Sequence, residues 1–212
     1  MKRKICLVLF FLFSIVNIGA TTRVDREDSF YLASNKLMNN MDFCENGVKV
    51  VYQSNSSLED EMHIIEDKLQ RKYTESKIEV SNKGIKIDCE NQKVSVDLYD
   101  KSGNTCVEIE LINNKKEKNI QNLMKELTEL QGNNVSEKRY FKYVKGRIND
   151  KENALDIIES TKELKHIDTL DIRNGYVGTA VLNDRDRVNF AVSTYNTGTY
   201  LIIGTPIIFT TY

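Results

Sequence analysis

The chain contains the same pattern twice, and this internal repeat constrains its fold more than any other feature. Residues 48–112 and 140–212 each read as a strand, an amphipathic helix and a meander of short strands, with matching landmarks about 90 to 95 residues apart. The landmark pairs are Ile64-Ile65-Glu66 with Ile157-Ile158-Glu159, Lys83-Gly84-Ile85 with Asn174-Gly175-Tyr176 and, more loosely, Tyr99-Asp100-Lys101-Ser102-Gly103 with Tyr195-Asn196-Thr197-Gly198. A duplicated unit of this kind predicts an α+β fold in which one curved, antiparallel sheet carries helices on one face.

The first 20 residues have the three parts of an export signal. Basic residues at positions 2–4 precede an apolar core at 5–18, and the small residues Gly19 and Ala20 follow. The core is about 14 residues long, whereas a membrane-spanning helix needs about 20, so cleavage after Ala20 is favoured over a retained anchor. The sequence therefore predicts a signal peptide at 1–20 and an exported protein, either secreted or associated with the cell envelope.

The charge balance argues against a polyanionic partner. Lys and Arg number 30 and Asp and Glu 31, so the loss of three basic leader residues leaves a net charge of −4. A chain with this balance is not expected to bind nucleic acid. About 190 residues remain after the leader, enough for one core, and no linker rich in proline or glycine divides them. Residues 21–212 are therefore predicted to form a single domain of two lobes that share one sheet.

An N-terminal helix is predicted at 26–43, before the first lobe. Its apolar residues from Phe30 to Met41 fall at helical spacing and form one stripe. Gly47 follows the stripe and is expected to end the helix. Because lobe one ends in a helix and lobe two ends in a strand, this N-terminal helix is expected to complete lobe two.

Lobe one, at 48–132, is predicted to begin with a strand and then a helix that Ser56 and Glu59 cap. The strands that follow alternate apolar and polar residues, as expected of a sheet with one face in solvent. A helix at about 117–131 closes the lobe. The predicted strands lie at 48–53, 77–81, 84–89, 93–99 and 105–112.

Lobe two, at 136–212, repeats this order. A strand precedes a helix capped by Asn149 with Glu152, and Asn174-Gly175 predicts a hairpin. The predicted strands lie at 137–148, 176–182 and 187–194, before a last apolar run at 200–212.

The stretch 201–209 is apolar on both alternations of a strand. It is either a buried central strand pair roofed by the N-terminal helix or an exposed patch for a partner, and the buried arrangement is favoured. Gly204-Thr205-Pro206 interrupts it and predicts a bend or bulge, because proline cannot donate a ladder hydrogen bond.

The end of the chain resembles a known family. Residues 188–196 read Val-Asn-Phe-Ala-Val-Ser-Thr-Tyr-Asn, and Gly204-Thr205-Pro206-Ile207-Ile208 and a terminal Tyr212 follow. This ending is similar to that of the YwmB-like family of exported proteins from spore-forming Gram-positive bacteria, which often has Glu where this chain has Thr211. The resemblance implies a fold like that of the TATA-box-binding protein, a saddle of antiparallel sheet with helices behind it. It also implies a setting in envelope remodelling during sporulation, and it brings no catalytic residues.

The helix-free face of the sheet is the predicted binding surface, because sheets of this kind usually bind rather than catalyse. A DNA-binding saddle needs a basic surface with apolar wedges. Here the predicted open face of lobe one is mixed to acidic, with Lys86, Asp88, Lys93, Asp97, Glu108 and Glu110, which argues against DNA. The candidate contact residues on the open face are Tyr99, Glu108, Glu110, Tyr140, Tyr143 and Tyr195. Tyrosine on such a face contacts peptides or sugars at low entropic cost, although it is also an ordinary strand residue.

No motif predicts a catalytic residue, a metal site or a cofactor. The sequence has no GxSxG, SxxK or HExxH motif and no phosphate-binding glycine loop. His63 within a helix and His166 at a helix end are interpreted as structural residues, the latter as a partner of the helix dipole. Asp184-Arg185-Asp186 is interpreted as a solvated turn and not as a calcium site. The three cysteines after the leader, Cys44, Cys89 and Cys106, are interpreted as small core residues, with one disulfide among them as the alternative.

The sequence therefore predicts an exported, envelope-associated module that binds an envelope protein, a peptide or a wall component. It predicts no cofactor and no membrane span after signal cleavage. The alternative is a cell-envelope hydrolase or transferase with an unrecognised active site, which requires a pocket holding at least two converging titratable groups. A third hypothesis is a structural protein that pairs with its own copy or another envelope protein through residues 201–212.

Overall fold

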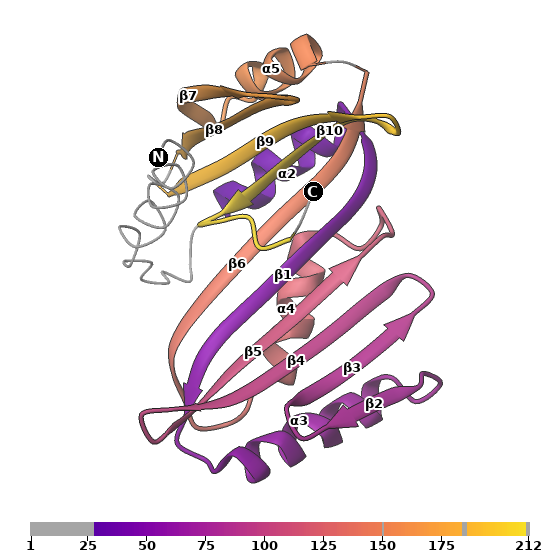
Figure 1. Ribbon diagram of the computed structural model, residues 1–212, viewed down its shortest axis with the longest axis vertical. Coiled ribbons are helices and arrows are strands. Elements are labelled where there is room, and N and C mark those ends of the chain that lie inside the picture. Colours follow the sequence, from indigo (N-terminus) through magenta and orange to yellow (C-terminus); the bar gives the residue numbers. More distant parts are fainter. Residues whose placement is uncertain (1–27, 150, 184–185, 211–212) are drawn as a thin grey trace, which may run out of the picture.

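The computed structural model describes residues 28–149, 151–183 and 186–210. Within these residues the fold is α+β, with one antiparallel sheet of ten strands and four helices (Figure 1). The predicted signal peptide and part of the predicted turn at Asp184-Arg185-Asp186 lie outside the described residues. The elements in chain order are α2 (Ser29–Asn39), β1 (Asp42–Ser54), α3 (Leu58–Lys72), β2 (Ile78–Ser81), β3 (Gly84–Cys89), β4 (Gln92–Lys101), β5 (Asn104–Asn113), α4 (Ile120–Leu130), β6 (Val135–Ile148), α5 (Lys151–Ser160), β7 (Leu164–Ile172), β8 (Gly175–Leu182), β9 (Arg187–Tyr195) and β10 (Gly198–Thr205).

The sheet is symmetric about the contact between its two longest strands. Its strand order is β2-β3-β4-β5-β1-β6-β10-β9-β8-β7, so β1 and β6 pair at the centre and each meander continues outward. The element order helix, long strand, helix and four strands occurs twice, from α2 to β5 and from α4 to β10. We call residues 29–113 unit one and residues 120–205 unit two.

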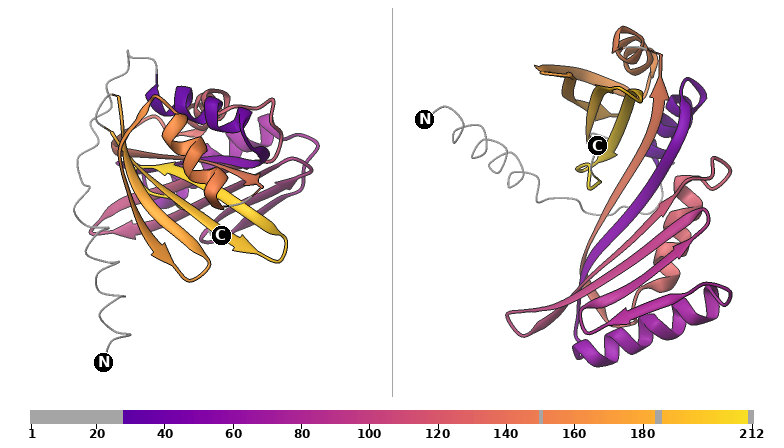
Figure 2. Two further views of the ribbon diagram at one scale, coloured as in Figure 1. Left: turned by 90° about the horizontal axis from the view of Figure 1, so that it is seen from above. Right: turned by 45° about the vertical axis from the view of Figure 1, so that its right-hand side comes forward.

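The sheet curves strongly, and the helices lie on its convex side and at its ends (Figure 2). Helix α4 packs on β1 and β5, and α2 packs on β1 and β6, so each of the two helices lies behind a different half. Helices α3 and α5 lie at opposite ends of the molecule (Figure 1). The equivalent landmark residues Ile65 on α3 and Ile158 on α5 are both fully buried in the same core.

Matching hairpins support the duplication. Strands β2 and β3 and strands β7 and β8 are each joined by a two-residue turn, and a glycine, Gly84 or Gly175, begins the strand that follows. A Cβ would lie 1.9 Å from the Val96 carbonyl oxygen at Gly84 and 1.8 Å from the Val192 carbonyl oxygen at Gly175. Both units therefore need glycine at the same close approach between strands.

The N-terminal helix and the first strand divide differently from the sequence prediction. Helix α2 ends at Asn39, not at 43, and β1 begins at Asp42, not at 48. The expectation that Gly47 ends the helix is wrong, because Gly47 lies inside β1 opposite Tyr143 of β6. A Cβ at Gly47 would lie 2.3 Å from Tyr143 Cε1, so the ring occupies the space that the glycine leaves.

The cap of α3 lies one residue later than predicted. Ser57, not Ser56, is the N-cap: its hydroxyl accepts from the Asp60 amide at 3.1 Å and donates to the Asp60 carboxylate at 2.7 Å. Helix α4 begins after the N-cap Asn119, whose side chain accepts from the Asn122 amide at 3.0 Å.

Strand β7 was not expected from the sequence. His166, predicted to lie at a helix end, lies inside this strand with φ +51°, at an irregularity between Lys165 and Asp168. Apolar and polar residues do not alternate strictly along this edge strand, and its register shifts between Lys165 and Asp168, so the strand pattern is hidden in the sequence. The dipole interpretation of His166 is therefore wrong.

The last apolar run forms one strand and not a strand pair, and it is buried only as far as Gly204, since Ile207 is 40% exposed. Leu201, Ile202 and Ile203 of β10 are at most 1% exposed. Strand β10 ends at Thr205, and the chain then turns at Pro206 and packs on the face of the sheet that points away from the main core. None of the helices in the described ranges is long and apolar enough to cross a membrane.

Candidate functional site: the concave face of the sheet

The concave face is the side of the sheet opposite α2 and α4 (Figure 2). Strand alternation assigns its residues: in β5, Val107, Ile109 and Leu111 are fully buried toward the helices, whereas Glu108 and Glu110 point the other way and are partly exposed. No helix of the described residues lies over this face.

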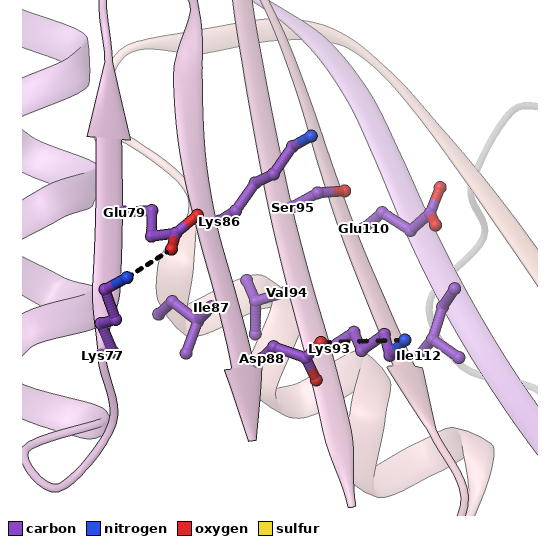
Figure 3. A pocket seen from close by; sticks show the side chains of 10 residues that line it. All are labelled: Lys77, Glu79, Lys86, Ile87, Asp88, Lys93, Val94, Ser95, Glu110 and Ile112. Carbon is purple, nitrogen blue, oxygen red and sulfur yellow. Dashed lines mark hydrogen bonds and ion pairs between the residues drawn. The ribbon is translucent and has the colours of Figure 1, made fainter. Parts of the chain in front are cut away.

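The half of the concave face in unit one is charged. A shallow depression of about 420 Å³ lies across β2, β3, β4 and β5 (Figure 3). Its lining residues are Lys77, Glu79, Lys86, Ile87, Asp88, Lys93, Val94, Ser95, Glu110 and Ile112. Two ion pairs lie within it, Lys77 with Glu79 at 2.8 Å and Lys93 with Asp88 at 3.8 Å. The two signs of charge alternate, so this surface complements a ligand that also carries both signs.

Three of the six candidate contact residues lie near one another in unit one. Tyr99 is 40% exposed, and its hydroxyl donates to Glu108 Oε1 at 3.3 Å. Glu108 also pairs with Lys49 of β1. Burial raises the pKa of Glu110, Lys49 opposes this effect, and the neighbouring Asp97 raises the pKa further. Glu110 therefore holds its proton to a higher pH than an ordinary glutamate.

The half of the concave face in unit two carries an apolar cluster that the chain itself covers. We call residues 206–210 the tail. Ile208 and Phe209 of the tail pack on a cluster separate from the main core. This second cluster consists of the buried residues Tyr143, Ala191 and Ile202 and the partly buried Val177. The Phe209 ring lies edge-on to the Tyr143 ring, with centroids 5.0 Å apart.

The expectation that Tyr140 and Tyr143 are exposed contacts is wrong for both. Residues three apart in a strand point to opposite faces of the sheet, so Tyr140 and Tyr143 cannot both lie on the concave face. Tyr143 lies on the concave face but is 0% exposed, beneath Phe209 and beside Gly47. Tyr140 packs against the main core, and its hydroxyl is hydrogen-bonded to the Gln131 amide.

Tyr195 is 41% exposed at the end of β9 in unit two, and four strands separate β9 from β4, the strand of Tyr99. Its ring lies 6.3 Å from the ring of Tyr200, and Lys145 Nζ lies 5.8 Å from the centroid of Tyr200. A second depression, of about 370 Å³, is lined by Cys44, Lys145, Ser193, Tyr195, Asn196, Thr197, Tyr200 and Ile202. The structure thus brings together Tyr99, Glu108 and Glu110 and leaves Tyr195 apart from them.

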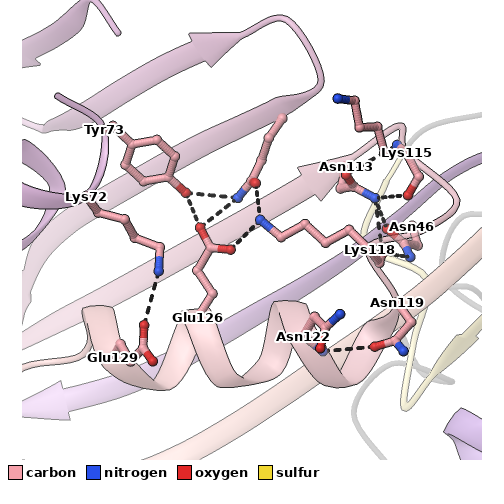
Figure 4. A network of polar contacts seen from close by, with 11 residues as sticks. Asn46, Lys72, Tyr73, Asn113, Lys115, Lys118, Asn119, Asn122, Glu126 and Glu129 are labelled. Carbon is pink, nitrogen blue, oxygen red and sulfur yellow. Dashed lines mark hydrogen bonds and ion pairs between the residues drawn. The ribbon is translucent and has the colours of Figure 1, made fainter. Parts of the chain in front are cut away.

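On the convex side, a buried network that sequence reasoning missed surrounds Glu126 of α4 (Figure 4). Lys118 Nζ lies 2.5 Å from Glu126 Oε2, Gln92 donates to Oε1 at 3.0 Å, and the Tyr73 hydroxyl also donates to Oε1. Burial alone would raise the pKa of Glu126, but these hydrogen bonds outweigh it and hold the pKa below the ordinary value. The available signal was a carboxylate within the apolar stripe of α4, three residues after Leu123.

Glu61 of α3 is a second carboxylate within an apolar stripe. It is 0% exposed and accepts from the Tyr52 hydroxyl and the Ser54 hydroxyl, each at 2.8 Å. A Cβ at Gly132 would lie 2.1 Å from Glu61 Oε1, so the chain after α4 passes directly over the carboxylate. These contacts hold α3, β1 and the end of α4 together. They leave the Glu61 carboxylate inaccessible to a ligand.

Neither histidine is among the residues that line the two depressions described above. His63 lies on the exposed side of α3, with Nδ1 3.9 Å from Asp67 Oδ1. Across the described ranges, no group of three or more His, Cys, Asp or Glu side chains is placed to hold a metal ion.

The three thiols are free. Cys106 is buried, as predicted, and Cys89 is partly buried and packs against the main core. Cys44 is partly exposed and belongs to neither hydrophobic cluster, so the core interpretation is wrong for Cys44. Cys44 lies at the irregularity of β1 between Phe43 and Glu45, and burial raises the pKa of its thiol.

No family model and no curated protein matches the chain. Among solved structures, the chain is similar to DynU16, a protein of the dynemicin biosynthetic locus, with 8% sequence identity and a TM-score of 0.31. The similarity covers 74% of this chain and 85% of DynU16. The fold itself defines the class of protein: an α+β fold with one curved antiparallel sheet, of which one face is free of helices in the described residues.

Proposed function

We propose that the protein is an exported, envelope-associated binding module whose ligand lies on the concave face of unit one. The observation that carries this proposal is the charged depression of about 420 Å³ on a face that no described helix covers. We also propose a saddle like that of the TATA-box-binding protein, an arrangement compatible with a ten-stranded sheet that has helices behind it. The proposal of membership of the YwmB-like family rests on the resemblance of residues 188–212. That family suggests a role in envelope remodelling during sporulation.

The ligand we propose is a peptide or wall component that carries both positive and negative groups. Lys86 and Lys93 point into the depression beside Asp88, and Glu110 lies at its other side (Figure 3). Such alternation repels a uniform polyanion but forms paired contacts with a zwitterionic chain. Tyr99 of β4, which is hydrogen-bonded to Glu108 of β5, adds an exposed aromatic surface.

The test is recovery of the purified protein with envelope fractions after cross-linking, and with purified cell wall. The double variant Glu108→Gln and Glu110→Gln should reduce recovery at least fivefold, and binding should weaken as salt concentration rises. The control is Glu129→Gln on the solvent side of α4, which should bind as the unmodified protein does. Equal recovery of all three proteins would contradict the proposal.

The hydrolase or transferase alternative has one specific observation in its favour. Glu110, with a raised pKa, lies at the rim of the depression beside Asp97 and Glu108, which are titratable groups of the kind that acid-base chemistry requires. Incubation of wall polymer with the protein tests it: release of soluble fragments that Glu110→Gln abolishes would establish an enzyme. Binding without any release would leave the binding module.

A further inference from the structure

The concave face of unit two carries a continuous apolar row that crosses four strands. Leu170 pairs with Val177, Val177 with Ala191, and Ala191 with Ile202, so the four side chains are cross-strand neighbours on one face. Leu170 stands at the open end of the row, on the edge strand β7.

The tail covers only the inner part of this row. Ala191 and Ile202 are 1% exposed beneath it, whereas Leu170 is 68% exposed and the neighbouring Ile172 is 40% exposed. A surface that was shaped solely to hold the tail would not extend beyond it. The exposed part leaves room for a longer segment than residues 206–210.

Side-chain contacts, and no strand ladder among the residues that the structure describes, hold the tail on the sheet. The contacts of the tail include the packing of the Ile208 and Phe209 side chains, with the Phe209 ring edge-on to Tyr143 and to Phe141. They also include a hydrogen bond from Asn189 Nδ2 to the Pro206 carbonyl and one between Thr210 and Tyr143. Within the described residues, no backbone hydrogen bond joins residues 206–210 to a strand. Ile207 remains 40% exposed. Side-chain contacts without a ladder can be exchanged for those of another segment.

We infer that the apolar row is an acceptor site for an extended apolar segment of a partner protein, and that the tail occupies it as an internal competitor. The tail itself shows the chemistry that fits: a branched aliphatic side chain, for which Gly204 leaves space, and an aromatic ring set edge-on against Tyr143. A partner segment would displace the tail, continue over Val177 to Leu170, and lie beside the outer edge of β7. The inference extends the proposed function to unit two.

The experiment measures binding of a labelled peptide with the sequence of residues 205–212, Thr-Pro-Ile-Ile-Phe-Thr-Thr-Tyr, by fluorescence anisotropy. Phe209→Ser in the full chain should release the tail and bind the peptide at least tenfold more tightly than the unmodified protein. Ile207→Ser is the matched control and should bind as the unmodified protein does, because Ile207 faces solvent. A peptide with Ser in place of Phe should not bind.

Asn189→Ala keeps the inference testable if Phe209→Ser does not fold, because it removes only the hydrogen bond to Pro206. It should bind the peptide about two- to fivefold more tightly than the unmodified protein. Equal affinity of all the variants, or no binding by any folded variant, would overturn the inference. A dimer of the unmodified protein that exchanges tails would also overturn it, since the occupant would then be a second copy. The Glu108 and Glu110 variants should leave peptide binding unchanged, so failure of the proposed function is distinguishable.

Discussion

The two halves of the concave face are built from strands in the same order but differ in their chemistry. Unit one presents alternating charges around Glu108 and Glu110, open to solvent, whereas unit two presents Tyr143, Ala191 and Ile202 beneath the tail. On the side of the sheet that faces the helices, both units contribute buried apolar residues to the core, as the fully buried Ile65 and Ile158 show. The duplication therefore fixes the side that forms the core and leaves the other side free to differ between the units.

The largest expected effect tests whether the two units share one core. Ile65→Ala and Ile158→Ala should each lower the free energy of unfolding by about 3 kcal/mol, because each leaves a cavity in the same cluster. Chemical denaturation followed by circular dichroism should show one transition for both variants. Two transitions, of which each variant shifts only one, would mean that the units fold independently.

The second prediction compares the polar links beneath the two units. Glu126 of α4, which packs behind β1 and β5, is 4% exposed, whereas the pair of Lys36 on α2 with Glu163, at 2.5 Å, has a lysine side chain that is 47% exposed. Glu126→Gln should lower the free energy of unfolding by about 2 kcal/mol, because it removes charge-assisted hydrogen bonds. Lys36→Met should cost about 0.5 kcal/mol. Equal losses in denaturation would remove this distinction.

The third prediction concerns the seam where the two units meet. Gly47→Ala should cost about 1.5 kcal/mol, because the added methyl group collides with the Tyr143 ring. In a double-mutant cycle, Tyr143→Leu should recover part of this loss. Strictly additive losses would contradict the contact across the seam.

The smallest effect is a pH dependence that differs in sign between two glutamates. The lowered pKa of Glu126 contributes stability above the unfolded value of 4.5, and this contribution is lost as pH falls through the folded value. The raised pKa of Glu110 acts oppositely: its cost appears as pH rises above 4.5. Glu110→Gln should therefore be slightly stabilising at pH 7 and neutral at pH 3. A loss of stability at pH 7 would contradict the account of its burial.

Local patterns in the sequence were sufficient to predict the meanders. Alternation located β3 at its observed bounds, and the turn glycines Gly84 and Gly175 marked equivalent hairpins in the two units. These features depend on neighbours along the chain or on a single hairpin partner. The candidate contacts Tyr99, Glu108 and Glu110 follow from the same alternation.

Features that depend on distant residues could not be predicted. Gly47 reads as a helix stop until its partner Tyr143, 96 positions away, is known. The burial of Tyr143 depends in turn on Phe209, and no local pattern signals that the tail returns across the sheet. Glutamate is usually found at the surface, and only the place of Glu126 among apolar neighbours indicates a buried network.

Tyrosine accessibility tests the central claim, that the concave face is open at Tyr99 in unit one and covered by the tail at Tyr143 in unit two. Nitration of the folded protein, mapped by mass spectrometry, should modify Tyr99 and Tyr195, which are 40% and 41% exposed, and spare Tyr143, which is 0% exposed. Phe209→Ser should make Tyr143 reactive and leave the rate at Tyr99 unchanged. Nitration of Tyr143 as fast as Tyr99 in the unmodified protein would contradict the account.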